Sequence, residues 1–456
     1  MKNQLQNLIK LLNQIIIILN TIAIKVEIHK QFNQDKHYTI QRNMKNQLKN
    51  MIKQLNQNQA MMFTITVKDK HYTIQRNMKN QLQNLIKQLN QIKIIPQYYC
   101  NKGNALCNLK KYEESIIEYD KAIELNPNYD DYYNSKGLAL QELYKYEESI
   151  IEFDKAIKLN PNYDDYYNSK GQALQNLKKY EESIIEFDKA IELNPNYDDY
   201  YNSKGNALCN QKKYEESIIE YDKAIELNPN YAEYYNSKGY ALYNLKKYEE
   251  SIIEYDKAIE LNPNDDDYYN IKGNALCNLK KYEESIIEYD KAIELNPNYD
   301  DYYNSKGLAL QEFYKYEESI IEFDKAIELN QNYSQYYCNK GQALCNLKKY
   351  EESIIEYDKA IELNPNYDDY YNSKGLALQE FYKYEESIIE FDKAIELNQN
   401  YSQYYCNKGQ ALFNLKKYEE SIIEFDKAIK LNPNDADSHF NKGVNNEVFK
   451  QDKPYT

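Results

Sequence analysis

The feature that most constrains this chain is the spacing of its glycines. All 11 glycines of the 456 residues stand 34 residues apart. They are Gly103, Gly137, Gly171, Gly205, Gly239, Gly273, Gly307, Gly341, Gly375, Gly409 and Gly443. A fixed period of this length indicates one supersecondary unit copied many times, so chain length says little about the number of domains. We number each unit so that its glycine stands at position 8. Because the glycines recur at this fixed period, we expect them to have a structural role.

Each unit reads as a pair of helices. In residues 130–163, Tyr133 and Gly137 lie on one face of a first amphipathic pattern, and Phe153 and Ala156 lie on one face of a second. Apolar residues recur at three- and four-residue steps, as an amphipathic helix requires. The small residues allow the helices to approach closely, and we expect the rings of Tyr133 and Phe153 to fill the space beside them. The unit is therefore predicted to be a helix hairpin.

The ends of the hairpin also have sequence signals. Pro161 disfavours helical geometry at the residue before it, so it ends the second helix. Asp130 or Asp131 is expected to cap the first helix. Burial of the large apolar side chains of one unit stabilises it by on the order of 10 kcal/mol, which is less than the entropic cost of ordering the unit. A single hairpin is therefore expected to fold only when it stacks on its neighbours.

The residue order within the unit resembles the tetratricopeptide repeat. That family has aromatic, Gly, Leu, aromatic, small, aromatic, Ala and Pro residues at positions 4, 8, 11, 17, 20, 24, 27 and 32. In the second unit these are Tyr133, Gly137, Leu140, Tyr146, Ser149, Phe153, Ala156 and Pro161. Lys136 replaces an apolar residue at position 7, and Gln331 and Gln399 replace the proline, so two joints are expected to be slightly looser.

The resemblance implies an all-α fold, a solenoid of helix hairpins wound as a right-handed superhelix. Ten tandem units are expected in residues 96–435, followed by a degenerate capping helix and tail in residues 436–456. Residues 1–95 form a separate basic segment rich in Asn and Gln. It is expected to contain amphipathic helices, as a coiled coil, a cap over the first hairpin or a surface anchor, or to be partly disordered.

The resemblance also implies that the first helices line a concave groove, with positions 2, 5, 6, 9, 12 and 13 facing inward. The candidate peptide-binding residues at positions 2, 5 and 9 are Asp131, Asn134, Asp165, Asn168, Asp199, Asn202, Asn206, Asn236, Tyr240, Asn270, Asn274 and Asn304. An asparagine amide can pair with the backbone of an extended peptide, and a neighbouring carboxylate favours Lys or Arg in it. Alternatively, each of these polar residues is simply solvated. Positions 9 and 12 vary most between copies and are expected to set specificity.

These patterns predict a scaffold or adaptor that binds an extended, neutral-to-basic segment of a protein partner. An alternative is a substrate-recruiting subunit that resembles the repeat arm of O-GlcNAc transferases and acts with a separate catalytic chain. A co-chaperone is a third interpretation. It is disfavoured because the array contains no arginine and lacks lysine at positions 2 and 5, where an acidic tail would be gripped.

Position 22 is isoleucine in all ten units, where the family often has a polar residue. The residues are Ile117, Ile151, Ile185, Ile219, Ile253, Ile287, Ile321, Ile355, Ile389 and Ile423. They form either an exposed apolar stripe for a second partner or for self-association, or a row partly buried against the neighbouring hairpin. We expect partial burial.

Charge separates the two parts of the chain. Residues 1–95 contain 15 Lys or Arg against 3 Asp or Glu, whereas the remainder contains 42 against 69. The acidic array is expected to repel nucleic acid and acidic membranes, whereas the basic segment could attract either. Leu8 to Val26 is apolar, but polar residues interrupt it, so a membrane role is not expected. Leu5, Leu8, Leu12, Ile15, Leu19 and Ile22 follow heptad spacing.

The chain lacks the residue patterns of an enzyme or a metal site. Seven cysteines form no CxxC pair, which favours free thiols in a reducing, cytoplasmic location. Only four histidines occur, none in an HxxxH pair, and every glycine belongs to a hairpin, which leaves none for a phosphate loop. The sequence therefore predicts no catalysis and no cofactor, and it leaves the oligomeric state open.

Overall fold

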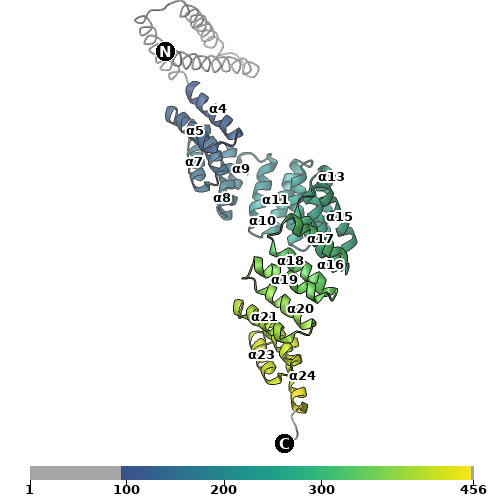
Figure 1. Ribbon diagram of the computed structural model, residues 1–456. Coiled ribbons are helices and arrows are strands. Elements are labelled where there is room, and N and C mark those ends of the chain that lie inside the picture. Colours follow the sequence, from purple (N-terminus) through teal and green to yellow (C-terminus); the bar gives the residue numbers. More distant parts are fainter. Residues whose placement is uncertain (1–93, 453–456) are drawn as a thin grey trace, which may run out of the picture. The chain divides into compact units, whose positions relative to one another are not determined.

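The computed structural model describes residues 94–452, and all regular structure in this part of the chain is helical (Figure 1). The helices alternate between first and second members of successive hairpins. In chain order they are α4 (Ile94–Asn108), α5 (Tyr112–Leu125), α6 (Asp130–Glu142), α7 (Tyr146–Leu159), α8 (Asp164–Asn176), α9 (Tyr180–Leu193), α10 (Asp198–Asn210), α11 (Tyr214–Leu227), α12 (Ala232–Asn244), α13 (Tyr248–Leu261), α14 (Asp266–Asn278), α15 (Tyr282–Leu295), α16 (Asp300–Glu312), α17 (Tyr316–Leu329), α18 (Ser334–Asn346), α19 (Tyr350–Leu363), α20 (Asp368–Glu380), α21 (Tyr384–Leu397), α22 (Ser402–Asn414), α23 (Tyr418–Leu431) and α24 (Ala436–Asp452). The helix hairpins predicted from the sequence are confirmed. The predictions for residues 1–93, including the heptads and the apolar run, lie outside the described residues.

The turn inside each hairpin is a Schellman motif without glycine. In the second unit, Tyr144 N–H donates to Gln141 O at 2.8 Å and Lys145 N–H donates to Leu140 O at 2.9 Å. Tyr144 has a φ of 59°, and the equivalent Lys or Tyr of the other nine units has a φ of 57° to 62°. Glycine is the usual residue at this left-handed position because it has no Cβ. Here no described glycine has a positive φ, so the glycines serve another purpose.

That purpose is close packing between the two helices of a hairpin. A Cβ built on Gly137 would lie 2.5 Å from Cε1 of Phe153, a ring that is fully buried. The same clash recurs in all ten full units. Next to it, the buried Ser149 hydroxyl donates to the Gly137 carbonyl at 2.8 Å. The close approach predicted from Gly137 is therefore confirmed.

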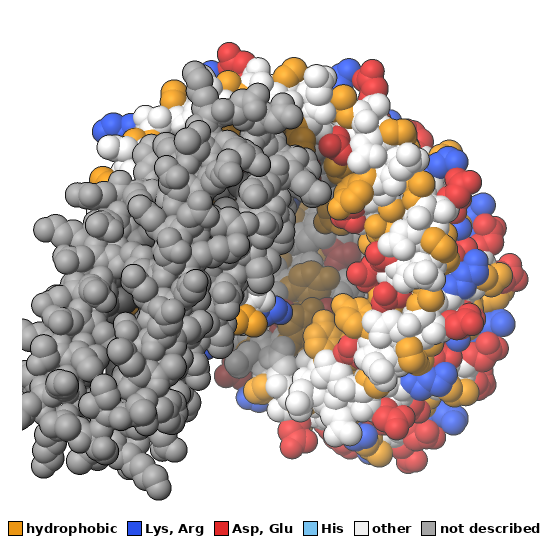
Figure 2. Space-filling model, turned by 90° about the horizontal axis from the view of Figure 1, so that it is seen from above, with side chains coloured by type: hydrophobic (Ala, Val, Ile, Leu, Met, Phe, Trp, Pro, Cys, Tyr) orange, Lys and Arg blue, Asp and Glu red, His pale blue; other side chains and the backbone are white. Residues whose placement is uncertain are grey.

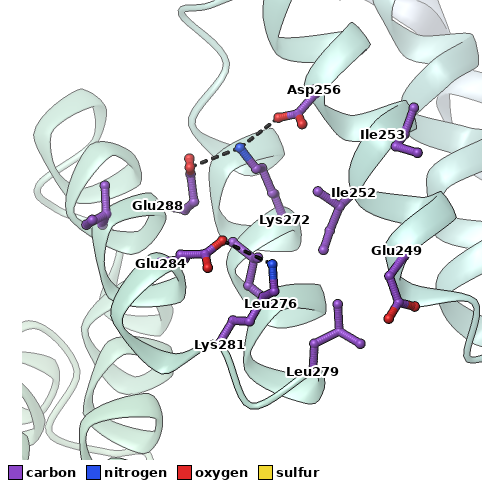
Figure 3. A pocket seen from close by; sticks show the side chains of 11 residues that line it. Glu249, Ile252, Ile253, Asp256, Lys272, Leu276, Leu279, Lys281, Glu284 and Glu288 are labelled. Carbon is purple, nitrogen blue, oxygen red and sulfur yellow. Dashed lines mark hydrogen bonds and ion pairs between the residues drawn. The ribbon is translucent and has the colours of Figure 1, made fainter.

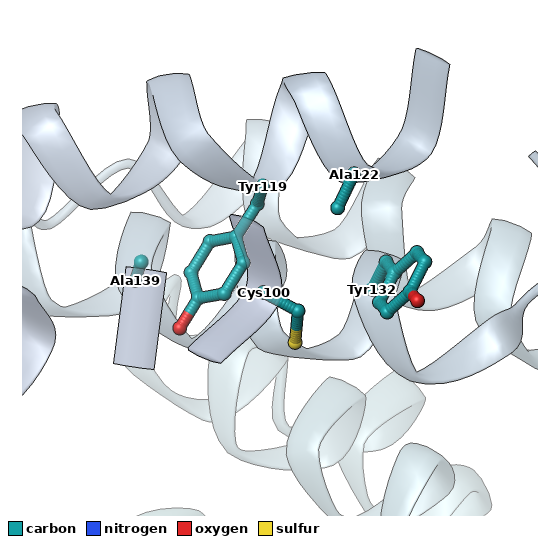
Figure 4. Close-up of a cluster of buried hydrophobic side chains, with 5 residues drawn as sticks. All are labelled: Cys100, Tyr119, Ala122, Tyr132 and Ala139. Carbon is teal, nitrogen blue, oxygen red and sulfur yellow. The ribbon is translucent and has the colours of Figure 1, made fainter. Parts of the chain in front are cut away.

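The inward-facing tyrosine of the first helix is not the one that was expected. Tyr132, at position 3, is 3% exposed, whereas Tyr133, at position 4, is half-buried. Tyr133 lies at the rim instead, where its hydroxyl donates to Pro127 O at 3.0 Å and Lys155 lies over its ring. The prediction that Tyr133 fills the hairpin interior was wrong, because the neighbouring second helix covers position 3 more fully than position 4. Figure 4 shows Tyr132 in the core of the first hairpins, with Tyr119 and Cys100.

Successive units are joined by a partly buried set of hydrogen bonds. Asp130 Oδ2 accepts from Asn160 Nδ2 and from the hydroxyl of Tyr166, both at 2.8 Å. Asp130 is the first residue of α6, and the N-cap residue is Tyr129, which makes no capping bond with its side chain. The expectation that Asp130 or Asp131 caps this helix was therefore wrong. The carboxylate of Asp130 ties its own hairpin to the next one, and the arrangement recurs at Asp164, Asp198, Asp266, Asp300 and Asp368.

Lysine at position 7 provides a second link between units. Lys136 Nζ lies 2.8 Å from Asp120 Oδ1 of the preceding unit and 3.1 Å from Glu152 Oε1 of its own. Its side chain is 18% exposed and that of Glu152 is 8% exposed, so the pair is shielded from water. Partial burial lowers the pKa of Lys136, but the hydrogen bonds to Asp120 and Glu152 outweigh this effect. The pKa therefore lies above its usual value, and the lysine stays charged. The lysine that departs from the family pattern therefore replaces an apolar contact with a bridge between hairpins.

Candidate inner binding surface

The first helices lie on the more crowded side of the stack. Besides their own second helices, α10 contacts the first helices α8 and α12 directly, and α14 contacts α16. Figure 2 shows described hairpins curving around a hollow, with apolar and acidic side chains on its wall. The candidate residues at positions 2, 5 and 9 all belong to these first helices.

The structure places the candidate residues at different depths. Asn202 is 7% exposed, whereas Asp131 and Tyr240 are exposed. The other nine are half-buried: Asn134, Asp165, Asn168, Asp199, Asn206, Asn236, Asn270, Asn274 and Asn304. A half-buried amide has fewer hydrogen bonds to water than an exposed one. Whether it is free to bind a ligand therefore depends on its hydrogen bonds within the protein.

Five position-5 asparagines share one unusual property. The side-chain oxygen of each is buried and has no hydrogen-bond partner; we call them the open asparagines. They are Asn134, Asn168, Asn202, Asn236 and Asn270. A buried polar atom without a partner costs about 1 to 3 kcal/mol. They occupy five consecutive units, so the cost recurs along one continuous strip of the first helices.

Two other position-5 asparagines have found a partner inside the protein; we call them the closed asparagines. Asn304 Oδ1 accepts from Asn339 Nδ2, and Asn372 Oδ1 accepts from Asn407 Nδ2, each at 2.8 Å. Both donors are position-6 residues of the following unit. Most other units have serine there, whose side chain is too short to close the same gap. The residue 35 positions later thus decides whether a position-5 amide is open or closed.

Position 9 has a structural role that the sequence analysis missed. Asn206 Oδ1 accepts from the Tyr221 hydroxyl, and Asn274 Oδ1 accepts from the Tyr289 hydroxyl, both at 2.7 Å. Where position 24 is phenylalanine, position 9 is Leu or Gln instead. Asparagine at position 9, where variation was expected to set specificity, therefore occurs only opposite tyrosine, and in four of the five units with tyrosine the position-9 side chain accepts from its hydroxyl. Comparison of the copies for paired changes at positions 9 and 24 could have shown this.

The carboxylates at position 2 are divided between packing and the open surface. Asp165 Oδ1 accepts from the Tyr200 hydroxyl of the next unit at 2.8 Å. Asp199 makes no such bond with Tyr234, whose hydroxyl goes to Asp198. Burial, and then the charge of Asp198, raise the pKa of Asp199, while a hydrogen bond with Asn202 partly offsets them. Partial desolvation, and then the charge of Asp130, likewise raise the pKa of Asp131. These two carboxylates retain free capacity to attract a cation.

The described residues contain no other recognisable chemical centre. All seven cysteines are free, and burial raises the pKa of the Cys100 thiol to about 11 and of the Cys338 thiol to about 12, so both are protonated at neutral pH. Within residues 94–452 no group of three His, Cys, Asp or Glu could hold a metal ion. In the same residues no helix is long and apolar enough to cross a membrane.

Family models recognise the repeat along the whole array. A model described as TPR repeat matches residues 103–143, 205–246, 273–312 and 341–380. Models described as tetratricopeptide repeat match residues 130–163, 164–197, 232–265, 300–333, 368–401 and 402–435, and another matches 186–219, 254–287 and 322–355. Together they cover residues 103–435 without a gap. The chain is a tetratricopeptide repeat protein. The family resemblance inferred from the residue order is thereby confirmed.

Solved structures show the same repeat at low identity. YrrB, described as a tetratricopeptide repeat protein with an unusual peptide-binding site, is 24% identical over 41% of this chain and 97% of its own, with a TM-score of 0.35. Yeast Tom70 is 16% identical over 78% of this chain and 96% of its own, with a TM-score of 0.42. The Cut9–Hcn1 structure is 13% identical over 77% and 76%, with a TM-score of 0.43. Curated proteins give no match. The similarity concerns the tetratricopeptide fold and does not extend to a partner.

Tetratricopeptide arrays are in general non-catalytic scaffolds for protein interactions, and this chain has that architecture. Protein binding is therefore the function class of this array.

Proposed function

We propose that the array is an adaptor that holds an extended, neutral-to-basic peptide segment of a partner against the first helices of its second to sixth units. The observation that supports this is the strip of five open asparagines from Asn134 to Asn270. An extended peptide has one backbone N–H and one C=O per residue, which are the groups that an amide can bind.

The open and closed asparagines differ in what binding would cost them. The side-chain oxygen of Asn202 has no hydrogen bond to lose when its amide turns toward a ligand, and only the bond between the amide and Asp199 would have to be given up. The oxygen of Asn304 would have to give up the bond from Asn339, and an internal hydrogen bond is worth roughly 1 kcal/mol. Binding is therefore expected to be easier in the units with open asparagines, which supports a peptide site over α6 to α14.

Charge supports a neutral-to-basic ligand. Asp131 is exposed beside Asn134, and Asp199 lies beside Asn202. Carboxylates at the rim of an interface raise the association rate of cationic ligands and reject acidic ones. The same argument keeps acidic chaperone tails at a disadvantage on this surface.

The test uses the full chain and immobilised nine-residue peptides of Gly, Ser and Lys, with Glu in place of Lys in a second set. Binding of the Lys set, weakened by salt and absent for the Glu set, is the expected result. Replacing Asn202, Asn236 and Asn270 by Ala should raise the dissociation constant at least tenfold without lowering helicity. The matched control is Asn304→Ala with Asn372→Ala, which should change affinity little.

Unchanged affinity in the triple variant would move the site away from the first helices. The alternative of a recruiting subunit for a separate enzyme uses the same surface, and a catalytic chain co-purifying with the full-length protein would favour it. We also propose a reducing, cytoplasmic location, which the seven free thiols support.

A further inference from the structure

The isoleucines at position 22 are exposed in every unit. Ile253 is 60% exposed and Ile287 is 54% exposed, and the other eight range from 54% to 61%. The expected partial burial against the neighbouring hairpin was wrong. First helices of neighbouring units crowd together, so the second helices diverge and leave their outer residues uncovered. An apolar side chain repeated along one surface is typical of an interaction site rather than of solvent exposure alone.

Between α13 and α15 these side chains border a groove (Figure 3). Its volume is about 420 Å³, and Leu276 and Leu279 line it together with Ile253 and Ile287. Lys272 lies along its wall and is held between Asp256 at 2.7 Å and Glu288 at 3.0 Å. The lysine charge is therefore already neutralised, and its carbon chain adds to the apolar lining.

The next groove along the stack is smaller. Between α15 and α17 the volume is about 210 Å³, bordered by Leu310 and Ile321. Position 14 is Phe313 in that unit instead of Leu279, and Lys315 lies over the Phe313 ring. The α13–α15 groove is accordingly the better receptor for apolar side chains.

Acidic residues surround the groove. Helices α13 and α15 each carry five carboxylates and one lysine. Glu249 lies at its edge, exposed to solvent, while Glu284 is paired with Lys281 at 3.5 Å. Four carboxylates and two lysines line the groove, so its net charge stays negative although Asp256, Glu284 and Glu288 are paired with lysines. This net charge favours a cationic partner and opposes a second copy of this acidic array.

We propose that the α13–α15 groove binds the apolar face of a basic amphipathic helix from a partner protein. Each bordering helix has 14 residues, or about 21 Å of length, so a ligand helix of similar length can lie along them. Its Leu or Ile side chains at three- and four-residue spacing would enter the groove, and its lysines would meet the carboxylates at the edge. The groove lies between the second helices α13 and α15, with Lys272 and Leu276 of the first helix α14 in its lining, and its lining does not include Asn270 of the peptide surface.

The test measures binding of a fluorescein-labelled 14-residue helical peptide of Leu and Lys to the full chain by anisotropy. A peptide of Leu and Glu is the charge control. Replacing Ile253 and Ile287 by Gln keeps the net charge and should raise the dissociation constant for the Leu/Lys peptide about tenfold. Leu138→Gln removes an exposed apolar residue of a first helix instead and should leave binding unchanged. A photo-reactive leucine in the peptide should cross-link to α13 or α15.

Several results would overturn the proposal. If the Leu/Glu peptide bound as tightly as the Leu/Lys peptide, charge would not select the ligand. If the Ile253→Gln, Ile287→Gln variant bound the Leu/Lys peptide as tightly as the unmodified chain does, the binding would be non-specific attraction to an acidic protein. A concentration-dependent dimer in light scattering that this variant abolishes would assign the groove to a second copy instead. The variant with alanine in place of Asn202, Asn236 and Asn270 should bind the Leu/Lys helix as the unmodified chain does. Failure of the groove proposal can therefore be distinguished from failure of the proposed peptide site.

Discussion

At the scale of single residues, a missing Cβ sets the distance between two helices. A Cβ on Gly239 would lie 2.6 Å from Cε1 of Tyr255, whose side chain is fully buried. Gly239 lies inside α12 and has no positive φ, so the backbone there does not require glycine. The glycine is needed only for space.

Replacing Gly239 by Ala should therefore destabilise the array. Alanine improves helix propensity by about 1 kcal/mol, but overpacking a filled core typically costs about 1 to 3 kcal/mol. We expect a lower midpoint of thermal unfolding, followed by circular dichroism. Gly443→Ala is the matched control, because nothing lies within 4 Å of its added Cβ. That variant should unfold at the same or a higher temperature, and a similar loss in both would contradict the packing argument.

The hydrogen bonds to the position-1 aspartates make the joints sensitive to acid. Partial burial raises the pKa of Asp130, but bonds from Asn160 and Tyr166 and from the backbone outweigh it, so the pKa lies below its usual value. The same holds for Asp164 and Asp198. A carboxyl with a depressed folded pKa stabilises the protein above its unfolded pKa of about 3.9 and loses that contribution as pH falls through the folded value.

Removing the tyrosine hydroxyls should reduce this acid sensitivity. In a variant with Phe at Tyr166, Tyr200 and Tyr234, the aspartate pKa values move toward the unfolded value. Less stability is then lost between pH 5 and pH 2 than in the unmodified chain, as measured by urea unfolding at each pH. The control is Tyr370→Phe, since the Tyr370 hydroxyl pairs with Ser334 and Gln335 and not with a carboxylate. An equal pH slope in all three proteins would exclude the aspartates as its source.

At the scale of helices and joints, position 32 tests whether proline is needed for geometry. The joint with Gln331 closely matches the one with Pro297. The preceding residues, Asn330 and Asn296, have φ and ψ of −141° and 86°, and of −138° and 83°. The Tyr337 hydroxyl donates to Gln331 O at 3.2 Å, and that of Tyr303 donates to Pro297 O at 3.1 Å. The expected looser joint is not visible in these bonds and angles.

Gln331→Pro should therefore stabilise the array. Proline in a compatible conformation stabilises by about 0.4 to 1 kcal/mol, chiefly by restricting the unfolded chain. The expected result is a higher urea midpoint than that of Gln331→Ala, which serves as the control. A lower midpoint would show that the joint at Gln331 differs from the proline joints in solution.

At the scale of the whole array, the main helix contacts within residues 94–452 join each hairpin to its immediate neighbours. Helix α23 packs against α24, and α11 packs against α12. Stability in such a solenoid is close to a sum of unit and neighbour contributions. A change at one end should therefore act locally.

Ending the chain after Asn434 tests this locality. The deletion removes α24, in which Ser438 and Asn445 are fully buried and Asn445 Nδ2 donates to Tyr418 O at 3.2 Å. Amide hydrogen exchange should accelerate in α22 and α23 and remain unchanged in α6 to α11. Uniform acceleration along the array would show that the solenoid unfolds as a single cooperative unit instead.

Much of the fold could be predicted because its signals are local. The 34-residue period, the amphipathic spacing around Phe153 and the helix-ending Pro161 all act within one unit. The candidate surface was harder to predict. The sequence identified the row from Asn134 to Asn304 but could not show that Asn304 is closed by Asn339, since that contact joins residues 35 positions apart.

By itself the sequence determined the hairpin, its length and the number of copies, because helix periodicity and turn chemistry depend on neighbouring residues. Only the tertiary structure decided that Tyr132 and not Tyr133 faces the core, that Asp130 binds Tyr166 of the next unit, and that Ile253 stays exposed. The physical reason is the stacking geometry. The angle between hairpins crowds the first helices and separates the second ones, and no local pattern specifies that angle.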